Sequence, residues 1–218
     1  MGDSFATRRR RMVDTQIASR GVSDPRVLEA MRTVPRERFL AKAAAELAYE
    51  DRPLSIAEGQ TISQPFIVAY MIEAASLRPD ARVLEVGAGS GYAAAVMSRL
   101  ASHVYAIERY PALAEGARRN LAALGYANVE IRAGDGTLGW PEAAPFDAVI
   151  VSAGGPQVPD PLKHQLAIGG VLILPVGGER HSQRLTRVTR TGEDRFTEED
   201  LCSVAFVPLI GKEGWRED

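Results

Sequence analysis

The sequence predicts an α/β protein built on a doubly wound, mostly parallel sheet. From Arg82 onward, short apolar runs of strand length alternate with helix-like stretches, a pattern typical of βαβ units. A glycine-rich turn, "GAGSG", directly follows the first of these runs. The 218 residues are 45% hydrophobic and 25% charged, which is enough apolar material for one sizeable core.

The N-terminal part predicts a helical lead-in over about residues 4–48. A first helix is expected to end at Gly21, a good C-cap, and the next to start with Ser23 and Asp24 as cap candidates and Pro25 near its first position. Residues 49–63 have loop character, and a further helix is expected from Pro65. We expect one domain, 1–218, with a lead-in and site junction in 1–78 and an α/β core with closing strands in 79–218.

The C-terminal part predicts the sheet itself. Strands are expected at 82–86, 103–108, 128–132, 146–151 and 171–176, with helices at 92–100, 113–124 and 159–166. Two further strand-like runs, 184–191 and 200–209, are separated by the charged stretch 192–200. They predict a closing antiparallel pair.

Charge and cysteine content limit the partners. With 26 Lys and Arg against 28 Asp and Glu, the net charge of -2 gives no general attraction to nucleic acid or to an anionic membrane. The run Arg8–Arg11 is interpreted as a solvated helix face. Cys202 is the only cysteine, so a disulfide framework within the chain and a thiolate metal cluster are both excluded. Because there is no export signal or membrane-length apolar run, we expect a soluble cytoplasmic monomer with no metal.

Three consecutive strand ends carry residues suited to one nucleoside. The glycine turn (Gly87, Ala88, Gly89, Gly91) lets the backbone approach a ligand closely. The next strand ends in Glu108, 21 positions after Gly87, where an acid can accept hydrogen bonds from ribose hydroxyls, and Arg109 follows it. The third strand leads into Asp135 and Gly136, suited to the adenine end.

The glycine spacing discriminates between cofactors. Dinucleotide folds use G-x-G-x-x-G/A, whereas here the third glycine is one place early and position 92 is Tyr. The pattern G-x-G-x-G resembles the class I S-adenosylmethionine (AdoMet)-dependent methyltransferases, which have a Rossmann-like sheet. AdoMet is therefore the expected cofactor, and NAD(P) is the alternative.

The junction "TISQP", Thr61 to Pro65, precedes a predicted helix. Pro disfavours helical conformation in the residue before it, so Gln64 should be extended and Ser63 should lie just outside the helix. Its hydroxyl would then be free beside the positive end of a helix dipole, a place that suits a carboxylate. The alternative is that Ser63 caps the helix while Thr61 and Ile62 pack.

Five motifs together resemble a known family over nearly the whole chain. "GQTISQPFIVAYM", "VLEVGAGSGY", "GDG" followed by "LGW", "IGGVLILPVGG" and "FVPLIG" are similar to those of the protein-L-isoaspartate (D-aspartate) O-methyltransferases. The resemblance implies methyl transfer from AdoMet to the α-carboxylate of isoaspartyl residues in damaged proteins. The ester then closes to a succinimide, whose hydrolysis returns some normal Asp, so the reaction initiates repair.

The resemblance also implies roles for individual residues. Ser63 would be the active-site residue at the isoaspartyl carboxylate. The AdoMet site would be formed by Gly87, Ala88, Gly89, Gly91, Glu108, Arg109, Asp135 and Gly136. The peptide would be bound by Thr61, Ile62, Ser63, Gln64, Val207, Pro208 and Leu209. One departure is the loop "VSAGGPQVP", where the family commonly has an Ala-Ala-Pro-like run, so Gly154 and Gly155 are expected to loosen that wall.

This chemistry needs no general base. A carboxyl group of pKa ~4 is already roughly 99.9% ionised at neutral pH, so orientation is the expected catalytic device and Ser63 is expected to hold the oxygen that does not attack. His103, His164 and His181 are accordingly assigned to strand, helix and loop surroundings. Two other functions stay open: methylation of another peptide or small-molecule acid, and AdoMet binding without catalysis.

Overall fold

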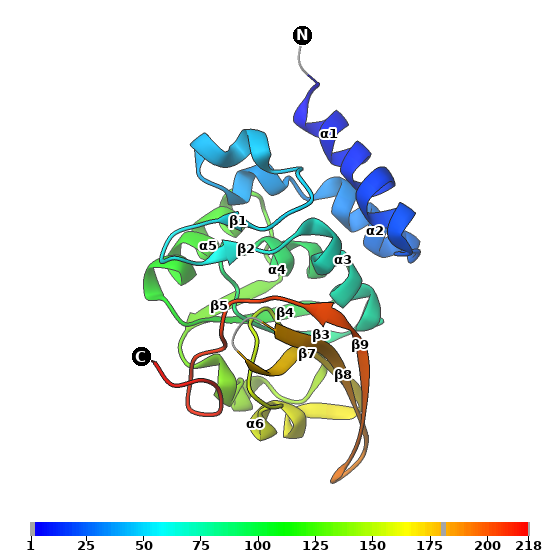
Figure 1. The fold of residues 1–218 in the computed structure, drawn as a ribbon, viewed down its shortest axis with the longest axis vertical. Helices are drawn as coiled ribbons and strands as arrows, with labels where there is room; N and C mark the ends of the chain where they lie inside the picture. The colour runs from blue at the N-terminus through cyan, green and yellow to red at the C-terminus, as the bar shows by residue number, and fades with distance from the viewer. Residues whose placement is uncertain (1–2, 180–181, 218) are drawn as a thin grey trace.

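The computed structural model describes residues 3–179 and 182–217 of the chain. Its main sheet has seven strands in the order β5-β4-β3-β6-β7-β8-β9 (Figure 1). The neighbouring strands in the part β5-β4-β3-β6-β7 are parallel to one another. The pairs β7-β8 and β8-β9 are antiparallel. The strands of this sheet are β3 Arg82–Val86, β4 His103–Glu108, β5 Val129–Ala133, β6 Phe146–Val151, β7 Leu166–Glu179, β8 Ser182–Gly192 and β9 Arg195–Val204. The predicted doubly wound sheet with closing antiparallel strands is confirmed.

Helices cover both faces of the sheet. The α-helices are α1 Phe5–Met12, α2 Pro25–Thr33, α3 Pro65–Ala74, α4 Tyr92–Met97, α5 Pro111–Ala123 and α6 Asp160–His164. Figure 1 shows α1 to α5 on one side of the sheet and α6 on the other. Alternating strand residues pack into the two cores: Val83 of β3 joins the core under α3 to α5, and Leu84 joins the core that contains Leu162 of α6.

The lead-in follows its sequence signals closely. Ser4 caps α1 by accepting a hydrogen bond from the Thr7 amide. The chain continues through a short π-helix, Val13–Ile17, and a 3-10 turn, Ala18–Arg20. This helical run ends at Gly21, whose φ is 102°. Asp24 then caps α2. Two more 3-10 turns, Arg36–Phe39 and Lys42–Leu47, complete the lead-in, which packs into the same core as α3 and α4.

A buried arginine ties the lead-in to the sheet domain. Arg36 is 0% exposed, donates from Nε to the Ala48 carbonyl at 2.8 Å, and lies over the Tyr92 ring at 4.9 Å. Burial lowers the pKa of its guanidinium to about 10, so it stays charged at neutral pH. Since Tyr92 opens α4 directly after the glycine turn, this contact connects the lead-in to the site described below.

Several boundaries differ from the sequence-based expectation. Helix α4 ends at Met97 and not at 100, and β9 ends at Val204 and not at 209. The predicted loop 49–63 contains a two-stranded antiparallel ribbon, β1 Leu54–Ser55 with β2 Thr61–Ile62. Strand β7 begins at Leu166, where a helix was expected to end. Strand β9 already begins at Arg195, because a tight turn pairs Gly192 with Arg195. Charged residues are tolerated in β9 since it is the edge strand and largely exposed.

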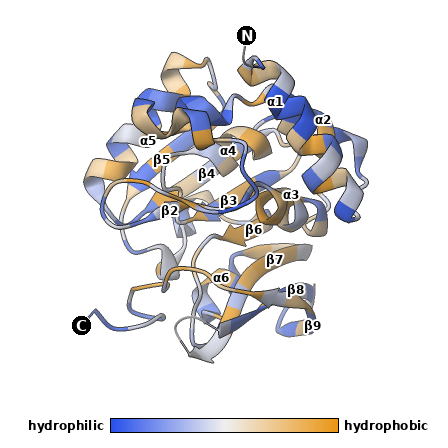
Figure 2. Cartoon of the chain, turned by 45° about the horizontal axis from the view of Figure 1, so that its top comes forward, coloured by the Kyte–Doolittle hydropathy of each residue, from blue (hydrophilic) through white to orange (hydrophobic). Residues whose placement is uncertain are grey.

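The basic run is only partly the solvated face that the sequence predicts. Arg10 and Arg11 are exposed, and Arg8 is half-buried and pairs with Glu46 at 2.7 Å. The Arg9 side chain is only 15% exposed and lies 3.9 Å from Glu37. In Figure 2, α1 is largely hydrophilic, whereas the central strands β6 and β7 are hydrophobic. Among the residues that the structure describes, we find no helix with the length and apolar character needed to cross a membrane.

Candidate active site

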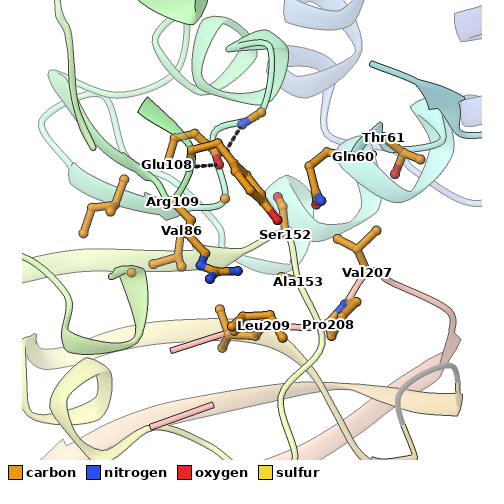
Figure 3. A pocket seen from close by; sticks show the side chains of 16 residues that line it. Gln60, Thr61, Val86, Glu108, Arg109, Ser152, Ala153, Val207, Pro208 and Leu209 are labelled. Carbon is orange, nitrogen blue, oxygen red and sulfur yellow. Dashed lines mark hydrogen bonds between the residues drawn. The ribbon is translucent and has the colours of Figure 1, made fainter. Parts of the chain in front are cut away.

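A cavity opens at the carboxyl ends of β3, β4 and β6, the edge at which open α/β sheets bind their ligands. Figure 3 shows its side chains. It is lined by Gln60, Thr61, Val86, Gly87, Gly89, Ile107, Glu108, Arg109, Tyr110, Gly136, Ser152, Ala153, Val207, Pro208, Leu209 and Ile210. The cavity therefore lies at the carboxyl edge of the sheet, where the sequence predicts a nucleoside site.

The glycine turn forms one wall of this cavity. Gly87 and Gly89 have φ of 88° and 55°, a left-handed backbone that favours glycine. The turn is held against β4 because the amides of Gly87 and Ala88 donate to the Ile107 carbonyl at 2.8 and 3.2 Å. Gly91 does not line the cavity; a Cβ there would lie 3.3 Å from Ala117, so this glycine lets the turn pack against α5.

Glu108 is fixed at the end of β4. It is 5% exposed, and its carboxylate accepts hydrogen bonds from the Gly89 amide at 2.7 Å and the Tyr110 amide at 3.0 Å. The carboxylate is thereby oriented at the cavity wall, with lone pairs left for hydroxyl donors. Arg109 also lines the cavity, and its Nη2 pairs with Glu217 at 2.5 Å.

Asp135 and Gly136 are neighbours in the chain, but they differ in whether they line the cavity. Gly136 lines the cavity, and a Cβ there would meet Val86 Cγ1 at 2.4 Å. Asp135 is not among the lining residues. Its carboxylate accepts from the Thr137 amide, the Thr137 hydroxyl and the Lys212 amide at 2.9, 2.7 and 2.8 Å. Asp135 therefore caps the 3-10 turn Gly136–Leu138 and fastens the C-terminal segment to it.

Ser63 lies in a smaller pocket that adjoins the cavity. That pocket is lined by Thr61, Ile62, Ser63, Val68, Glu85, Gly87, Ala88, Gly89, Ser90, Tyr92, Ala93 and Ser152. As expected, α3 starts at Pro65, and its N-cap Gln64 is extended, with ψ 133°, and makes no side-chain cap. The Gln64 amide group turns away to Asp51, 2.8 Å from Oδ1. Within the described residues the Ser63 hydroxyl has no hydrogen bond, so it does not cap the helix.

Glu85, which was not among the predicted site residues, also lines the smaller pocket. Its side chain is 1% exposed and its Oε2 has no hydrogen-bond partner within the described residues. Burial, followed by the negative charge of Glu108, raises the pKa of Glu85 well above the ordinary 4.5. The available signal was an acidic residue among the apolar residues of 83–86, "VLEV".

The C-terminal segment Val207–Leu209 forms the wall that faces Thr61. In the view of Figure 3, Ser152 lies between Glu108 on one side and Val207 and Pro208 on the other. The Gly154 amide donates to the Val207 carbonyl at 2.8 Å, and the Leu209 amide donates back to Gly154 at 2.8 Å.

The expected loosening at Gly154 and Gly155 is not found. Gly155 donates to Pro175 and accepts from Gly177, both at 3.0 Å, and the Trp215 indole donates to Gly154 at 3.0 Å. These bonds join the glycine loop to β7 and to the C-terminal segment. The wall is therefore held by backbone hydrogen bonds on both sides.

The two histidines that the structure describes, His103 and His164, line neither the cavity nor the smaller pocket. The His103 ring lies 4.4 Å from the Tyr105 ring on β4, and His164 on α6 contacts the Asp160 carbonyl through Nδ1 at 2.9 Å. His181 lies outside the described residues. Over 3–179 and 182–217, no group of three or more His, Cys, Asp or Glu is arranged to hold a metal ion.

The strand order, the glycine turn and the acid at the end of the second core strand define a class I AdoMet-dependent methyltransferase. The model of the family described as Protein-L-isoaspartate(D-aspartate) O-methyltransferase (PCMT) matches residues 7–214. The chain belongs to this family. It is accordingly an enzyme whose cofactor is AdoMet and whose methyl acceptors are L-isoaspartyl residues of proteins.

Similar proteins agree in sequence and in fold. Protein-L-isoaspartate O-methyltransferase of Protochlamydia amoebophila (strain UWE25) is 60% identical over 205 residues, which cover 94% of this chain and 98% of the relative. A second relative, from Pelobacter propionicus, is 59% identical over 208 residues, 95% of this chain and 92% of its own.

Two solved structures are also similar. A protein-L-isoaspartate O-methyltransferase is 33% identical with a TM-score of 0.84, over 94% of this chain and 67% of its own. The Plasmodium falciparum beta-aspartate methyltransferase, crystallised in complex with S-adenosyl-L-homocysteine, is 26% identical with a TM-score of 0.81, over 93% of this chain and 98% of its own.

Proposed function

We propose that the cavity and the adjoining pocket together perform methyl transfer to the α-carboxylate of isoaspartyl residues, with Ser63 at the acceptor carboxylate. The single observation that carries this assignment is that Ser63 shares a pocket with the glycine turn. A nucleoside-binding turn and a hydroxyl free of other hydrogen bonds thus face the same space. The residues of the cavity and of the smaller pocket can therefore bring the methyl donor and the methyl acceptor together.

The residues of the cavity fit AdoMet. Glu108 offers oriented carboxylate oxygens to ribose hydroxyls. The buried Glu85, whose Oε2 has no partner, suits the ammonium group of the ligand, since a cation would compensate its charge. The ligand can approach the backbone closely at Gly87, Ala88, Gly89 and Gly136. Arg109 closes one side of the cavity. Asp135 and Gly91 do not line the cavity and instead hold the two turns in place. When bound, AdoMet supplies an electrophilic methyl group on a sulfonium.

The acceptor side is assigned to Ser63 and its surroundings. Ser63 precedes the ten-residue helix α3, whose positive end favours a carboxylate. The Ser63 hydroxyl donates to the carboxylate oxygen that does not attack, leaving the other oxygen in line with the methyl group. Thr61, Ile62, Val207, Pro208 and Leu209 hold the peptide on either side. Gln64 acts indirectly, by fixing the junction to Asp51. Such orientation can supply on the order of 7–11 kcal/mol.

The test compares two matched peptides, one with an isoaspartyl and one with a normal aspartyl residue, as acceptors of tritiated methyl groups. We expect incorporation only into the isoaspartyl peptide. Equal incorporation into both peptides, or preference for a small-molecule acid, would assign the site to another carboxylate. A D-aspartyl peptide in the same assay measures the tolerance of the site for that isomer.

We also propose the cellular setting of the reaction. The methyl ester closes to a succinimide and so starts repair of damaged proteins. The net charge of -2 supports the lack of nucleic-acid and membrane partners, and the single cysteine is compatible with a reducing cytoplasm. We propose that the enzyme is a monomer. One continuous core joins the lead-in 1–78 to residues 79–218, which supports a single domain over 1–218. Gel filtration with light scattering tests the monomer.

A further inference from the structure

Four residues line both the main cavity and the smaller pocket: Thr61, Gly87, Gly89 and Ser152. They mark the passage through which a methyl group would move from the cofactor to the acceptor. Only Thr61 and Ser152 carry side chains that can donate a hydrogen bond. Thr61 belongs to the N-terminal junction, whereas Ser152 follows β6. The passage therefore has a hydroxyl on each of two unrelated elements.

Ser152 is held by the backbone around it. Its amide donates to the Val86 carbonyl at 2.8 Å, which ties it to the strand before the glycine turn. Its Cβ lies 3.6 Å from the place where a Cβ on Gly87 would be. Two residues later, Gly154 is bonded to Val207 and Leu209 of the peptide wall. Ser152 is thus fixed both to the cofactor side and to the acceptor side.

The Ser152 hydroxyl is free for a ligand. It is half-buried, and within the described residues its oxygen has no hydrogen-bond partner. The Ser63 hydroxyl likewise has no hydrogen-bond partner within the described residues, and both serines line the smaller pocket. A single donor fixes one carboxylate oxygen but leaves the group free to rotate about the bond that carries it. A second donor from another element removes that freedom.

We infer that Ser152 is a second hydrogen-bond donor to the acceptor carboxylate, acting from the β6 side while Ser63 acts from the α3 side. This inference rests on the proposed function of the pocket. The two hydroxyls together fix the plane of the carboxylate, so that the attacking oxygen points at the methyl group. Ser152 thereby acts as a catalytic residue on the acceptor carboxylate, from the boundary between the cavity and the smaller pocket.

The test measures methyl transfer and ligand binding separately. Ser152→Ala should lower kcat/KM for an isoaspartyl peptide roughly 10- to 100-fold, the effect of losing a hydrogen bond to a charged group. Calorimetric affinity for S-adenosylhomocysteine should stay within about twofold of wild type. Ser152→Thr, which restores the hydroxyl, should recover most of the activity. Ser203→Ala, an exposed serine on β9 outside both pockets, is the matched control.

A double-mutant cycle separates this inference from the assignment of Ser63. If both hydroxyls hold one carboxylate, Ser63→Ala with Ser152→Ala should lose less than the product of the single losses. Wild-type kcat/KM in Ser152→Ala, or an equal loss of S-adenosylhomocysteine affinity, would overturn the role of Ser152 and leave the proposed function intact. Failure of the proposed function would instead show as no isoaspartyl preference in the wild-type enzyme.

Discussion

Glu85 is a buried acidic residue in the lining of the smaller pocket. Because its pKa is raised above 4.5 in the folded protein, the folded state binds the proton more tightly than the unfolded state does. The stability that this provides is complete below about pH 4.5 and is lost as the pH rises through the raised pKa. A bound cation would oppose that shift.

Glu85→Gln should therefore stabilise the free enzyme at neutral pH and weaken the binding of AdoMet. The amide keeps the shape of the side chain but has no charge to desolvate, so we expect Tm to rise by roughly 2–4 °C for each kcal/mol gained. Scanning calorimetry at pH 5 and pH 8 should show the gain mainly at the higher pH.

The affinity of Glu85→Gln for S-adenosylhomocysteine should fall by about 10-fold or more, since a charge-assisted hydrogen bond is lost. Glu130→Gln, at an exposed position on β5, should change neither quantity. Unchanged affinity in Glu85→Gln would remove Glu85 from the ligand site.

Ser63→Ala tests the assignment at the α3 junction. The variant should lose roughly 10- to 100-fold in kcat/KM for an isoaspartyl peptide because one donor to the acceptor carboxylate is gone. Its stability and S-adenosylhomocysteine affinity should be unchanged, since the hydroxyl makes no hydrogen bond within the described residues and does not cap α3. Wild-type turnover would contradict the assignment.

Site residues were predictable where a local rule exposes them. Pro65 placed Ser63 outside the helix, and the distance of Glu108 from the glycine turn placed it on the cavity. Ser152 has no such rule, and Glu85 has only the signal of an acidic residue inside an apolar run, which does not say what the carboxylate binds. A serine after a strand is common, and the pocket that Glu85 enters exists only once β2 and α4 have packed over the strand.

The turn Gly136–Leu138 connects β5 to the cavity, and its first residue has no room for a side chain. A Cβ on Gly136 would lie 2.4 Å from the buried Val86 Cγ1. Gly136→Ala should therefore push the turn away from β3, lower stability by about 1–3 kcal/mol and weaken S-adenosylhomocysteine binding. Chemical denaturation and calorimetry measure the two effects.

Gly134→Ala is the matched control in the same loop. A Cβ at Gly134 meets nothing within 4 Å, and its φ is not in the left-handed region. This variant should keep both stability and affinity. Equal losses in both variants would show that the loop tolerates no side chain at either position and that contact with Val86 is not the cause.

The C-terminal segment is fastened through Thr137. The buried Thr137 hydroxyl donates to Asp135 and accepts from the Glu213 amide at 3.1 Å. Thr137→Val keeps the shape but leaves that amide unpaired, so it should cost about 1–3 kcal/mol. Hydrogen exchange should accelerate over residues 211–215, and the peptide KM should rise more than the cofactor Kd.

Thr189→Val on β8 serves as the control for this substitution, because the Thr189 hydroxyl has no hydrogen bond within the described residues. It should leave exchange in residues 211–215 as in wild type. Unchanged exchange in Thr137→Val as well would mean that the other contacts of the segment, including Asp135 with Lys212, are sufficient.

Elements with strong periodicity were predictable, and short or exposed ones were not. The buried strands β3, β4 and β6 lie where their apolar runs predict them. The ribbon β1-β2 has two residues in each strand, too few to give a pattern. The start of β9 was placed too late because its charges resemble a loop, although they are compatible with an edge strand.

The turnover of the enzyme saturated with both substrates should show little dependence on pH near neutrality. The acceptor carboxylate is already ionised, and the described histidines lie outside the site. With both substrates saturating, kcat should vary by less than about twofold from roughly pH 6 to 8 and fall only as the acceptor carboxylate is protonated near pKa ~4. A limb with an apparent pKa near 6.5 would indicate a histidine base.

At the scale of the whole molecule, the βαβ alternation and the glycine turn were enough to predict the sheet and the edge that carries the cavity. The sequence did not reveal how the lead-in is attached. The buried Arg36 reaches Tyr92 across more than fifty residues of chain, and such a contact depends on tertiary packing that no local periodicity encodes.

The outer strand of the sheet has a consequence for an enzyme that handles damaged chains. Strand β9 leaves one side of its backbone unpaired in the sheet, and Glu198, Glu199 and Asp200 are exposed along it. Charged side chains on an edge strand discourage a further strand from adding to it. We therefore expect partly unfolded client chains not to extend the sheet at β9 when they meet the enzyme.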